Sequence, residues 1–285
     1  MTSVPSYVVP FLRRRSITPR MLRITVGGPA LAGFTGGRVA DERIKLLLPP
    51  AGATVPALPT IDERGIHFPE DQPRPAMRTF TVQGFDRERL ELHVDVALHS
   101  RGPAVEWARS ARPGDLVGIT GPRHLDPWPV PVDVRLIAGD ESALPAIAGL
   151  LRRLPADARG LAVIEVHDRA EEQPLEHPEG IELRWLHRGD RSPVLGPLGD
   201  AVRAWPWPTD AEVGVWAAGE ATVMRALRAY VRETRAVPRD ASHVVGYWRY
   251  RHSEDEAAAA AARALERASA AGHDVDELLD AGYAA

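Results

Sequence analysis

The sequence predicts a two-domain protein in which an antiparallel β-barrel is followed by an α/β domain with a parallel sheet. Three observations lead to this fold class. A chain of 285 residues is long for one compact core. Residues 1–122 contain short, alternating apolar segments separated by Gly and Pro. From residue 133 onward, strand-like segments alternate with amphipathic helical ones, which is typical of a parallel sheet covered on both faces.

The first domain, residues 1–122, contains six candidate strands and one short helix. The strands are expected at Tyr7–Arg15, Met21–Gly27, Arg43–Leu48, Met77–Gln83, Leu90–Ala97 and Leu116–Gly121. The helix is expected at Pro103–Ser110, because proline suits the first turn of a helix. Short strands joined by tight turns favour a closed or nearly closed antiparallel barrel of the Greek-key type.

A proline-rich, semi-rigid linker at residues 123–132 leads to the second domain, residues 133–252. Its expected strands are Val134–Ala138, Leu161–His167, Ile181–His187, Val213–Ala217 and Ser242–Tyr247. Its expected helices are Ala143–Leu154, part of Pro193–Trp205, and Glu220–Thr234. Residues 253–285 form a helical extension, with a helix at 254–271 for which Ser253 is a suitable N-cap.

Composition excludes several classes of function. A net charge of −4 argues against a nucleic-acid-binding protein, whose binding surface would be basic. The absence of cysteine excludes disulfides, a thiol nucleophile and a cysteine-ligated iron–sulfur cluster within the chain. No apolar run reaches the length of a membrane span, and no signal-peptide pattern is visible, so we expect a cytoplasmic protein. The oligomeric state stays open, with a monomer favoured.

The tetrapeptide Arg78-Thr79-Phe80-Thr81 places a cation, an aromatic ring and two hydroxyl groups at one edge of the expected barrel. Alternate residues of a strand share a face, so Arg78 and Phe80 point one way and the two threonines the other. A guanidinium pairs with phosphate in a forked geometry, and an aromatic ring can cover a flavin. The alternative is an ordinary strand end with a surface arginine.

A second motif runs from His99 to Ala108 and places Gly102 directly before the helix that starts at Pro103. The amides and the dipole at the start of a helix form an anion site, for which a pyrophosphate is a natural occupant. The alternative is a capped helix with Trp107 packed in the core.

Three further motifs lie at strand ends of the second domain. Gly139–Pro145 forms the first strand-to-helix turn, where nucleotides bind in such sheets, although it lacks the common G-x-G-x-x-G fingerprint. Trp216–Glu220 offers small residues that let a flat ring approach the backbone. Gly246-Tyr247-Trp248-Arg249 ends the last strand, with a plug at the domain interface as the alternative.

The order of these five motifs resembles that of the siderophore-interacting protein family. The motifs read Arg-Thr-Phe-Thr, His-(x)2-Gly-Pro-Ala-(x)2-Trp-Ala, Gly-Asp-Glu-Ser-Ala-Leu-Pro, Ala-Gly-Glu-Ala and Gly-Tyr-Trp-Arg, within residues 5–252. Members of that family are flavin-dependent ferric-siderophore reductases related to the ferredoxin–NADP reductase superfamily. The resemblance implies an N-terminal FAD-binding barrel, a C-terminal NAD(P)H-binding domain, and reduction of siderophore-bound iron(III) that frees iron.

The resemblance also implies roles for individual residues. Arg78 would pair with the FAD pyrophosphate, Phe80 would lie on the flavin, and Thr81 would approach its N5 region. The implied FAD-contacting residues are Arg78, Thr79, Phe80, Thr81, His99, Gly102, Pro103, Ala104, Val105, Asp140, Glu141 and Ser142. The last three would meet the flavin or the nicotinamide across a cleft. The implied NAD(P)H-contacting residues are Ala218, Gly219, Glu220, Tyr247 and Trp248.

Four positions depart from the family pattern. Phe80 stands where tyrosine is usual, so one hydroxyl contact to FAD is lost, and Gln83 stands where arginine is frequent. Val105 replaces a common serine, which leaves phosphate binding there to backbone amides. Ser142 replaces threonine, a mild change.

NAD(P)H gives a hydride whereas iron(III) accepts one electron, and a flavin couples the two kinds of transfer. We therefore expect no catalytic acid or base, and no iron ligand, from the protein. Arg188 and Arg169, which follow two strands, are candidate partners for the 2′-phosphate of NADPH, and the choice between NADPH and NADH stays open. Arg249 and Arg251 are candidates for docking an anionic ferric siderophore. Two alternatives remain: a flavoprotein reductase with another acceptor, and a siderophore- or flavin-binding protein without turnover.

Overall fold

The computed structural model describes residues 4–37, 39–62, 65–98, 102–123, 128 and 130–250. The chain divides into two compact units, Met1–Leu125 and Asp126–Ala285. The expected extension at residues 253–285 lies outside the described residues, and so do positions 124–127 and 129 of the expected linker. The boundaries of the predicted domains therefore stay a prediction.

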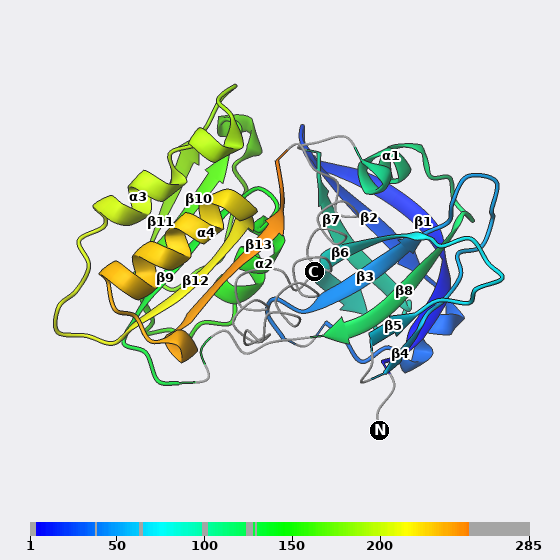
Figure 1. Cartoon of the computed structure of the whole chain (residues 1–285), viewed down its shortest axis with the longest axis horizontal. Helices are drawn as coiled ribbons and strands as arrows, with labels where there is room; N and C mark the ends of the chain where they lie inside the picture. The colour runs from blue at the N-terminus through cyan, green and yellow to red at the C-terminus, as the bar shows by residue number, and fades with distance from the viewer. Residues whose placement is uncertain are drawn as a thin grey trace, which may run out of the picture. The chain divides into compact units, whose positions relative to one another are not determined.

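The first unit is a closed six-stranded barrel whose neighbouring strands are all antiparallel, as predicted (Figure 1). Its strands are β1 (Ser6–Thr18), β2 (Met21–Gly27), β3 (Arg43–Leu48), β6 (Ala76–Asp86), β7 (Glu91–Ala97) and β8 (Leu116–Arg123). They follow the order β1-β2-β7-β6-β3-β8, so the chain crosses over two strands between β2 and β3. A small hairpin of β4 (Thr60–Asp62) and β5 (Gly65–His67), which the sequence did not predict, adds a separate sheet.

Strand alternation fills the barrel with aliphatic side chains. Ile24 of β2 pairs in register with Val94 of β7, and Val26 pairs with Leu92. All four side chains are fully buried, and burial of each contributes roughly 1.5–3 kcal/mol. Helix α1 (Pro103–Ser110) packs on β7 and β3. The barrel wall therefore holds α1 against two of its strands.

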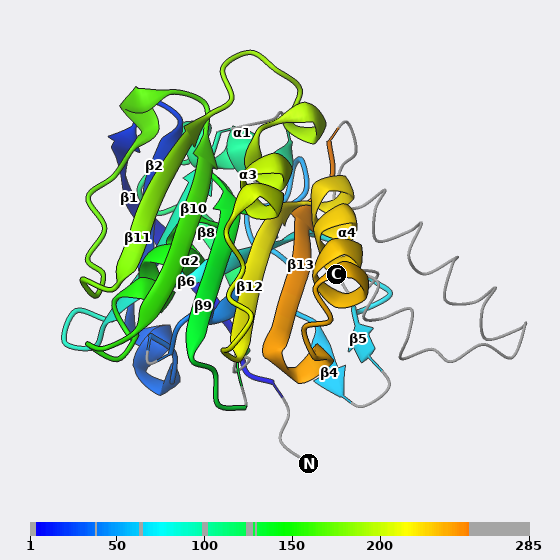
Figure 2. The same cartoon turned by 90° about the vertical axis from the view of Figure 1, so that its left-hand side faces the viewer.

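The second unit is a five-stranded parallel sheet, again as predicted. Its strands are β9 (Val134–Asp140), β10 (Arg159–Val166), β11 (Ile181–His187), β12 (Val213–Glu220) and β13 (Ser242–Trp248). Figure 2 shows α3 (Leu198–Ala204) and α4 (Ala221–Ala229) on one face of the sheet and α2 (Leu144–Leu151) on the other. The near-continuous apolar pattern of the strands follows from this cover on both faces.

The strand order β11-β10-β9-β12-β13 contains one reversal. The chain steps from β9 to β10 to β11 on one side and then returns to β12 and β13 on the other. In open sheets of this kind, ligands bind beyond the carboxyl ends of the strands where the order reverses, which here is between β9 and β12. The residues that end those two strands are Asp140 and Glu220.

Three predicted helices are shorter than expected. The segment Ala143–Leu154 contains α2, which ends at Leu151. The segment Glu220–Thr234 forms α4 and then one π-helical turn, η4 (Tyr230–Thr234). The segment Pro193–Trp205 contains a short 3-10 turn, η3 (Pro193–Leu195), and then α3. Two further 3-10 turns are η2 (Arg169–Glu171) and η5 (Arg239–Ala241), and one in the barrel unit is η1 (Pro29–Gly33). Across the described ranges, no helix combines the length and the apolar character needed to cross a membrane.

Candidate functional site

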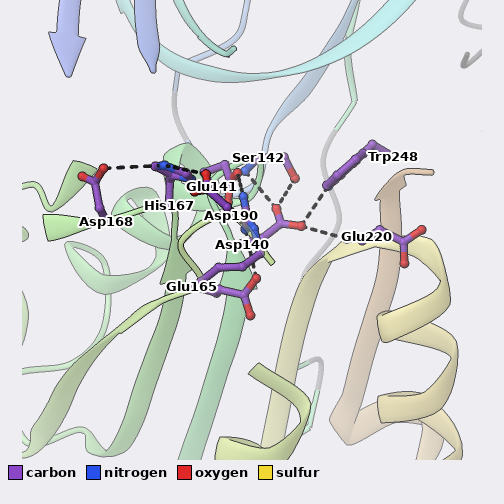
Figure 3. Close-up of polar contacts among 10 residues, drawn as sticks. Asp140, Glu141, Ser142, Glu165, His167, Asp168, Asp190, Glu220 and Trp248 are labelled. Atoms are coloured by element: carbon purple, nitrogen blue, oxygen red, sulfur yellow. Dashed lines mark hydrogen bonds and ion pairs between the residues drawn. The ribbon is translucent and has the colours of Figure 1, made fainter. Parts of the chain in front are cut away.

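Asp140 ends β9, next to the place between β9 and β12 where the strand order reverses, which we call the switch point. It accepts hydrogen bonds from several of the polar groups there (Figure 3). Its Oδ1 atom accepts hydrogen bonds from the backbone N and the Oγ of Ser142, at 2.9 and 2.5 Å. Its Oδ2 atom accepts from the backbone N of Glu220 and from Nε1 of Trp248, both at 2.8 Å. One buried carboxylate thus connects the ends of β9, β12 and β13.

Asp140 is 4% exposed, and this burial governs its protonation. Burial, followed by the negative charge of Glu141, raises the pKa of Asp140 to about 7, against the opposing effect of the bonds from Ser142 and Trp248. The carboxyl group therefore changes charge near neutral pH.

Glu220 ends β12 and caps the helix that follows. Its Oε2 accepts from the backbone N of Thr222 and Val223, at 2.6 and 3.0 Å, in the manner of an N-cap residue. Its Oε1 accepts from the backbone N of Tyr250 at 3.1 Å. Ala218 and Gly219 precede it in the same strand, and Ala218 is fully buried.

Arg188 follows β11 and lies in a buried ion-pair cluster. Its guanidinium donates to both carboxylate oxygens of Glu141, at 2.6 and 3.0 Å, and to Oε1 of Glu165 at 3.0 Å. Glu165 in turn accepts from the backbone N of Leu198, the first residue of α3. The cluster thus ties the ends of β9, β10 and β11 to the start of α3.

The pKa values in this cluster follow from burial and pairing. Burial alone would lower the pKa of Arg188, but its bonds to Glu141 and Glu165 raise it overall. Burial raises the pKa of Glu165, and Arg188 opposes that effect. A guanidinium that is 6% exposed and bonded to two carboxylates is engaged inside the protein, which differs from the solvent-facing cation that NADPH recognition requires.

The end of β13 carries the two predicted aromatic residues in different surroundings. Tyr247 packs edge-on against Trp216, with ring centroids 6.4 Å apart. Trp248 is half-buried, and its indole points toward Asp140 in Figure 3. A register shift between Gly219 and Glu220 against β13 places Trp248 opposite Glu220. Arg249 follows and is half-buried.

A further group of polar residues lies after β10 and β11. The Nε2 atom of His167 is 3.7 Å from Oδ2 of Asp168 and 4.0 Å from Oδ1 of Asp190. Arg169, the second candidate for 2′-phosphate recognition, starts η2 and is exposed. Unlike Arg188, its side chain faces solvent.

In the barrel, the tetrapeptide lies within β6, paired with β3. Arg78 is opposite Leu46, and Phe80 is opposite Ile44. Arg78 is 7% exposed, and its Nη1 donates to the carbonyl of Met77 at 2.8 Å. Phe80 is half-buried against the hydrophobic core of the barrel.

The two threonines of the tetrapeptide differ from each other. Thr79 is exposed, whereas Thr81 is buried. Two residues further on, Oε1 of Gln83 is buried and has no hydrogen-bond partner in the described part of the chain. A buried acceptor of this kind is suited to a donor on a bound ligand.

Helix α1 begins without a side-chain cap. Gly102 is the N-cap residue, Pro103 starts the helix, and a Cβ atom added at Gly102 would meet nothing within 4 Å. The free space and the uncapped amides of Ala104 and Val105 match the donor set that a phosphate group needs. Trp107 packs edge-on against Phe11 with centroids 5.6 Å apart, so the core role of that tryptophan and an anion site at the helix start coexist.

Two predicted residues cannot be placed, because His99 and Arg251 lie outside the described residues. Sequence reasoning also missed the carboxylate partner of Arg188 on β10. Glu165 is the only charged residue in the otherwise apolar run Leu161–Val166, and a buried carboxylate in such a strand requires a cation or hydrogen-bond donors. That signal could have identified it.

A closed antiparallel barrel followed by a parallel sheet with polar groups at its switch point defines a two-domain, nucleotide-binding architecture. Family models match both units: the siderophore-interacting FAD-binding domain over residues 10–126, and the siderophore-interacting protein model over residues 132–251. The chain belongs to the siderophore-interacting protein family.

Individual relatives cover most of the chain. The chain is 31% identical over 247 residues to the ferric vibriobactin reductase ViuB of Vibrio cholerae, which covers 86% of this chain and 90% of that protein. It is 34% identical over 220 residues to the NADPH-dependent ferric-chelate reductase of Escherichia coli, covering 76% and 82%. A siderophore utilization protein from T. fusca has a similar structure, with a TM-score of 0.77, 35% identity, and coverage of 89% and 96%.

Proposed function

We propose that this protein is a ferric-siderophore reductase, an FAD-dependent oxidoreductase that passes electrons from NADPH or NADH to siderophore-bound iron(III). Reduction to iron(II) weakens the hold of hard oxygen ligands and releases the metal. The main support for this proposal is that the two family models match adjacent parts of one chain, at residues 10–126 and 132–251.

In the barrel, the donor set fits FAD. We assign Arg78 to the pyrophosphate, together with the amides of Ala104 and Val105 at the start of α1, beside Gly102 and Pro103. The exposed part of the Phe80 ring would cover the flavin, and Thr79 and Thr81 would supply hydroxyl groups from the other face of the same strand. When bound, FAD supplies the coupling of a two-electron hydride donor to a one-electron acceptor.

In the parallel sheet, the switch point fits the nicotinamide donor. We assign Ala218 and Gly219, the small residues near the end of β12, to the space beside the nicotinamide, and Ser142 adds a hydroxyl group. Asp140 and Glu220 fix the backbone that surrounds this space through the bonds described above. Trp248 and Tyr247 supply the aromatic surface at the end of β13.

The buried Glu141–Arg188 pair is assigned a positioning role in this proposal. Because Arg188 is bonded to two carboxylates, recognition of a 2′-phosphate would fall to an exposed cation such as Arg169. Arg249 and Arg251 remain the proposed docking residues for an anionic ferric siderophore. The site of action is the cytoplasm, where reduced nicotinamides are supplied, and the monomer is the proposed state.

The test begins with the protein loaded with FAD under anaerobic conditions. We expect the yellow colour to bleach with NADH or NADPH and to return when a hydroxamate or a catecholate iron(III) complex is added. Comparison of the two nicotinamides at equal concentration identifies the donor.

Two outcomes would contradict the proposal. A protein that gains no flavin would remove the cofactor on which the chemistry depends. A flavoprotein that bleaches, but is reoxidised by free flavin or a quinone and not by ferric siderophores, would be a reductase with another acceptor.

A further inference from the structure

The indole of Trp248 is held by its polar edge. Its Nε1 donates to Oδ2 of Asp140 at 2.8 Å, and the backbone two residues later, at Tyr250, donates to Oε1 of Glu220 at 3.1 Å. Two carboxylates from the ends of β9 and β12 therefore fix the segment that leaves β13, and Figure 3 shows the bond from Trp248 to Asp140.

Trp248 as a whole is half-buried. Its neighbour Tyr250 meets it edge-on, with centroids 6.5 Å apart. A tryptophan that is fixed at its N–H edge and partly open elsewhere is a rigid surface on which a flat heteroaromatic ring can stack. Stacking of such a ring on an aromatic side chain contributes about 1–3 kcal/mol in nucleotide binding.

Gly219 makes the approach of the Asp140 carboxylate possible. A Cβ atom at position 219 would lie 2.6 Å from Oδ2 of Asp140, the same atom that accepts the indole N–H. Any side chain there would displace the carboxylate from Trp248. The bond from Trp248 to Oδ2 of Asp140 therefore requires a glycine at position 219.

We propose that Asp140 is a positioning residue for the nicotinamide donor, which acts by fixing the indole of Trp248 beside the switch point so that the donor's heteroaromatic ring can stack on it. This inference rests on the proposed function, because it assumes that the sheet binds a nicotinamide dinucleotide. It adds a division of roles: Trp248 touches the donor, whereas Asp140 does not touch it and acts on it through Trp248.

The test measures dinucleotide binding and not turnover. Asp140→Asn keeps the shape of the side chain. It replaces one of the two carboxylate oxygens, each of which accepts two hydrogen bonds, with an NH2 group that cannot accept them. Trp248→Phe keeps an aromatic ring and removes the N–H. The dissociation constants of NAD+ and NADP+ are measured by calorimetry for the FAD-loaded full chain, for each variant, and for the double variant.

We expect each single substitution to weaken binding of the dinucleotide about fivefold, which is the effect of one lost hydrogen bond. The double variant should bind about as weakly as either single variant, because both remove the same contact. In steady-state assays, the KM for the donor should rise with kcat changed less than about twofold. Trp207→Phe is the matched control, since it also removes an indole N–H bond, to the carbonyl of Val202 at 3.1 Å, at a place outside the site. Its dissociation constants should equal those of the wild type.

If Asp140→Asn does not fold, Trp248→Phe decides the test alone. Trp248 is only half-buried, so we expect that variant to fold. The positioning role would be overturned if Trp248→Phe bound the dinucleotides as tightly as the wild type. It would also be overturned if the losses of affinity from the two single substitutions multiplied in the double variant. Either result would leave the proposed function intact. A wild-type protein that binds neither dinucleotide would overturn the proposed function itself.

Discussion

The barrel and the parallel sheet differ in how their buried and partly buried charged side chains are paired. In the barrel, Arg23 pairs with Asp95 at 2.7 Å, directly opposite it on the neighbouring strand. In the sheet, Arg188 is bonded to Glu141 and Glu165, which come from the ends of two other strands. The barrel pair is local to two strands, whereas the sheet cluster joins three strands and the start of a helix.

The difference follows from topology. Antiparallel neighbours bring side chains face to face along their whole length, so an ion pair forms wherever opposite charges align. Parallel strands that all end at one edge bring their last residues together, so charges placed there become one buried network. Removal of one charge has a local effect in the barrel and a wider one in the sheet.

The largest predicted effect comes from Arg188→Met. Loss of the guanidinium leaves Glu141 and Glu165 buried without their cation, which should lower the free energy of unfolding by about 3–5 kcal/mol. Urea denaturation followed by circular dichroism measures this. A loss below about 1 kcal/mol would mean that the cluster is not the connected network described here.

The second prediction concerns the pH dependence of the free energy of unfolding, to which Asp140 in the sheet contributes. Because the pKa of Asp140 is raised to about 7, the folded state binds a proton that the unfolded state does not bind between pH 4 and pH 7. This contribution to stability is present below the unfolded pKa and is lost as pH rises through 7. The folded-state value of about 7 and the ordinary value of 3.8 set its upper limit at about 4 kcal/mol.

The measurement is the free energy of unfolding from pH 4 to pH 8 for the wild type and for Asp140→Asn. The wild type should lose stability with rising pH more steeply than the variant. Equal slopes for the two proteins would show that Asp140 titrates normally.

The third prediction compares two arginines that are both buried. Arg78 in the barrel is 7% exposed and Arg188 in the sheet is 6% exposed, yet we assign only Arg78 to a ligand. Arg78→Met should weaken FAD binding at least tenfold, or about 2 kcal/mol, because a charge-assisted bond to phosphate is lost. Fluorescence titration of the apoprotein with FAD checks this.

Arg74→Met is the control for that experiment. Arg74 is exposed on the same unit, with its guanidinium 5.0 Å from the Phe68 ring centroid, and its loss should leave the FAD dissociation constant unchanged. Equal effects of the two substitutions would point to a general loss of positive charge and not to a phosphate contact.

The smallest effect is expected at the barrel surface. The Arg13–Glu91 pair is short, but the side chain of Arg13 is 53% exposed. Arg13→Met should change the free energy of unfolding by less than about 1 kcal/mol. The change should shrink further in high salt, which urea denaturation at two ionic strengths would detect. A loss as large as that from Arg188→Met would remove the contrast between the two units.

Local patterns predicted most of the fold. β2, β3 and α1 have the predicted bounds, because alternation, turn residues and a proline at the helix start all agree there. The hairpin of β4 and β5 was missed, since strands of 3 residues carry too little pattern. The early end of α4 was missed because residues 230–234 keep a helical pattern while they form a π turn.

The candidate site was predictable in part. Asp140, Glu220 and Trp248 were each singled out by their position at a strand end, Asp140 for FAD and the other two for NAD(P)H, and the structure connects all three. The sequence could not tell that Arg188 points inward, because burial depends on carboxylates 47 and 23 residues away. Only the fold brings such distant partners together.

The most direct test of the central claim is the yield of iron(II) per nicotinamide oxidised. With a ferrous-specific chelator present and oxygen excluded, the FAD-loaded protein should release two iron(II) ions from a ferric siderophore for each NADPH or NADH consumed, and Arg78→Met without bound FAD should release none. Oxidation of the nicotinamide with no iron(II) released would contradict the account.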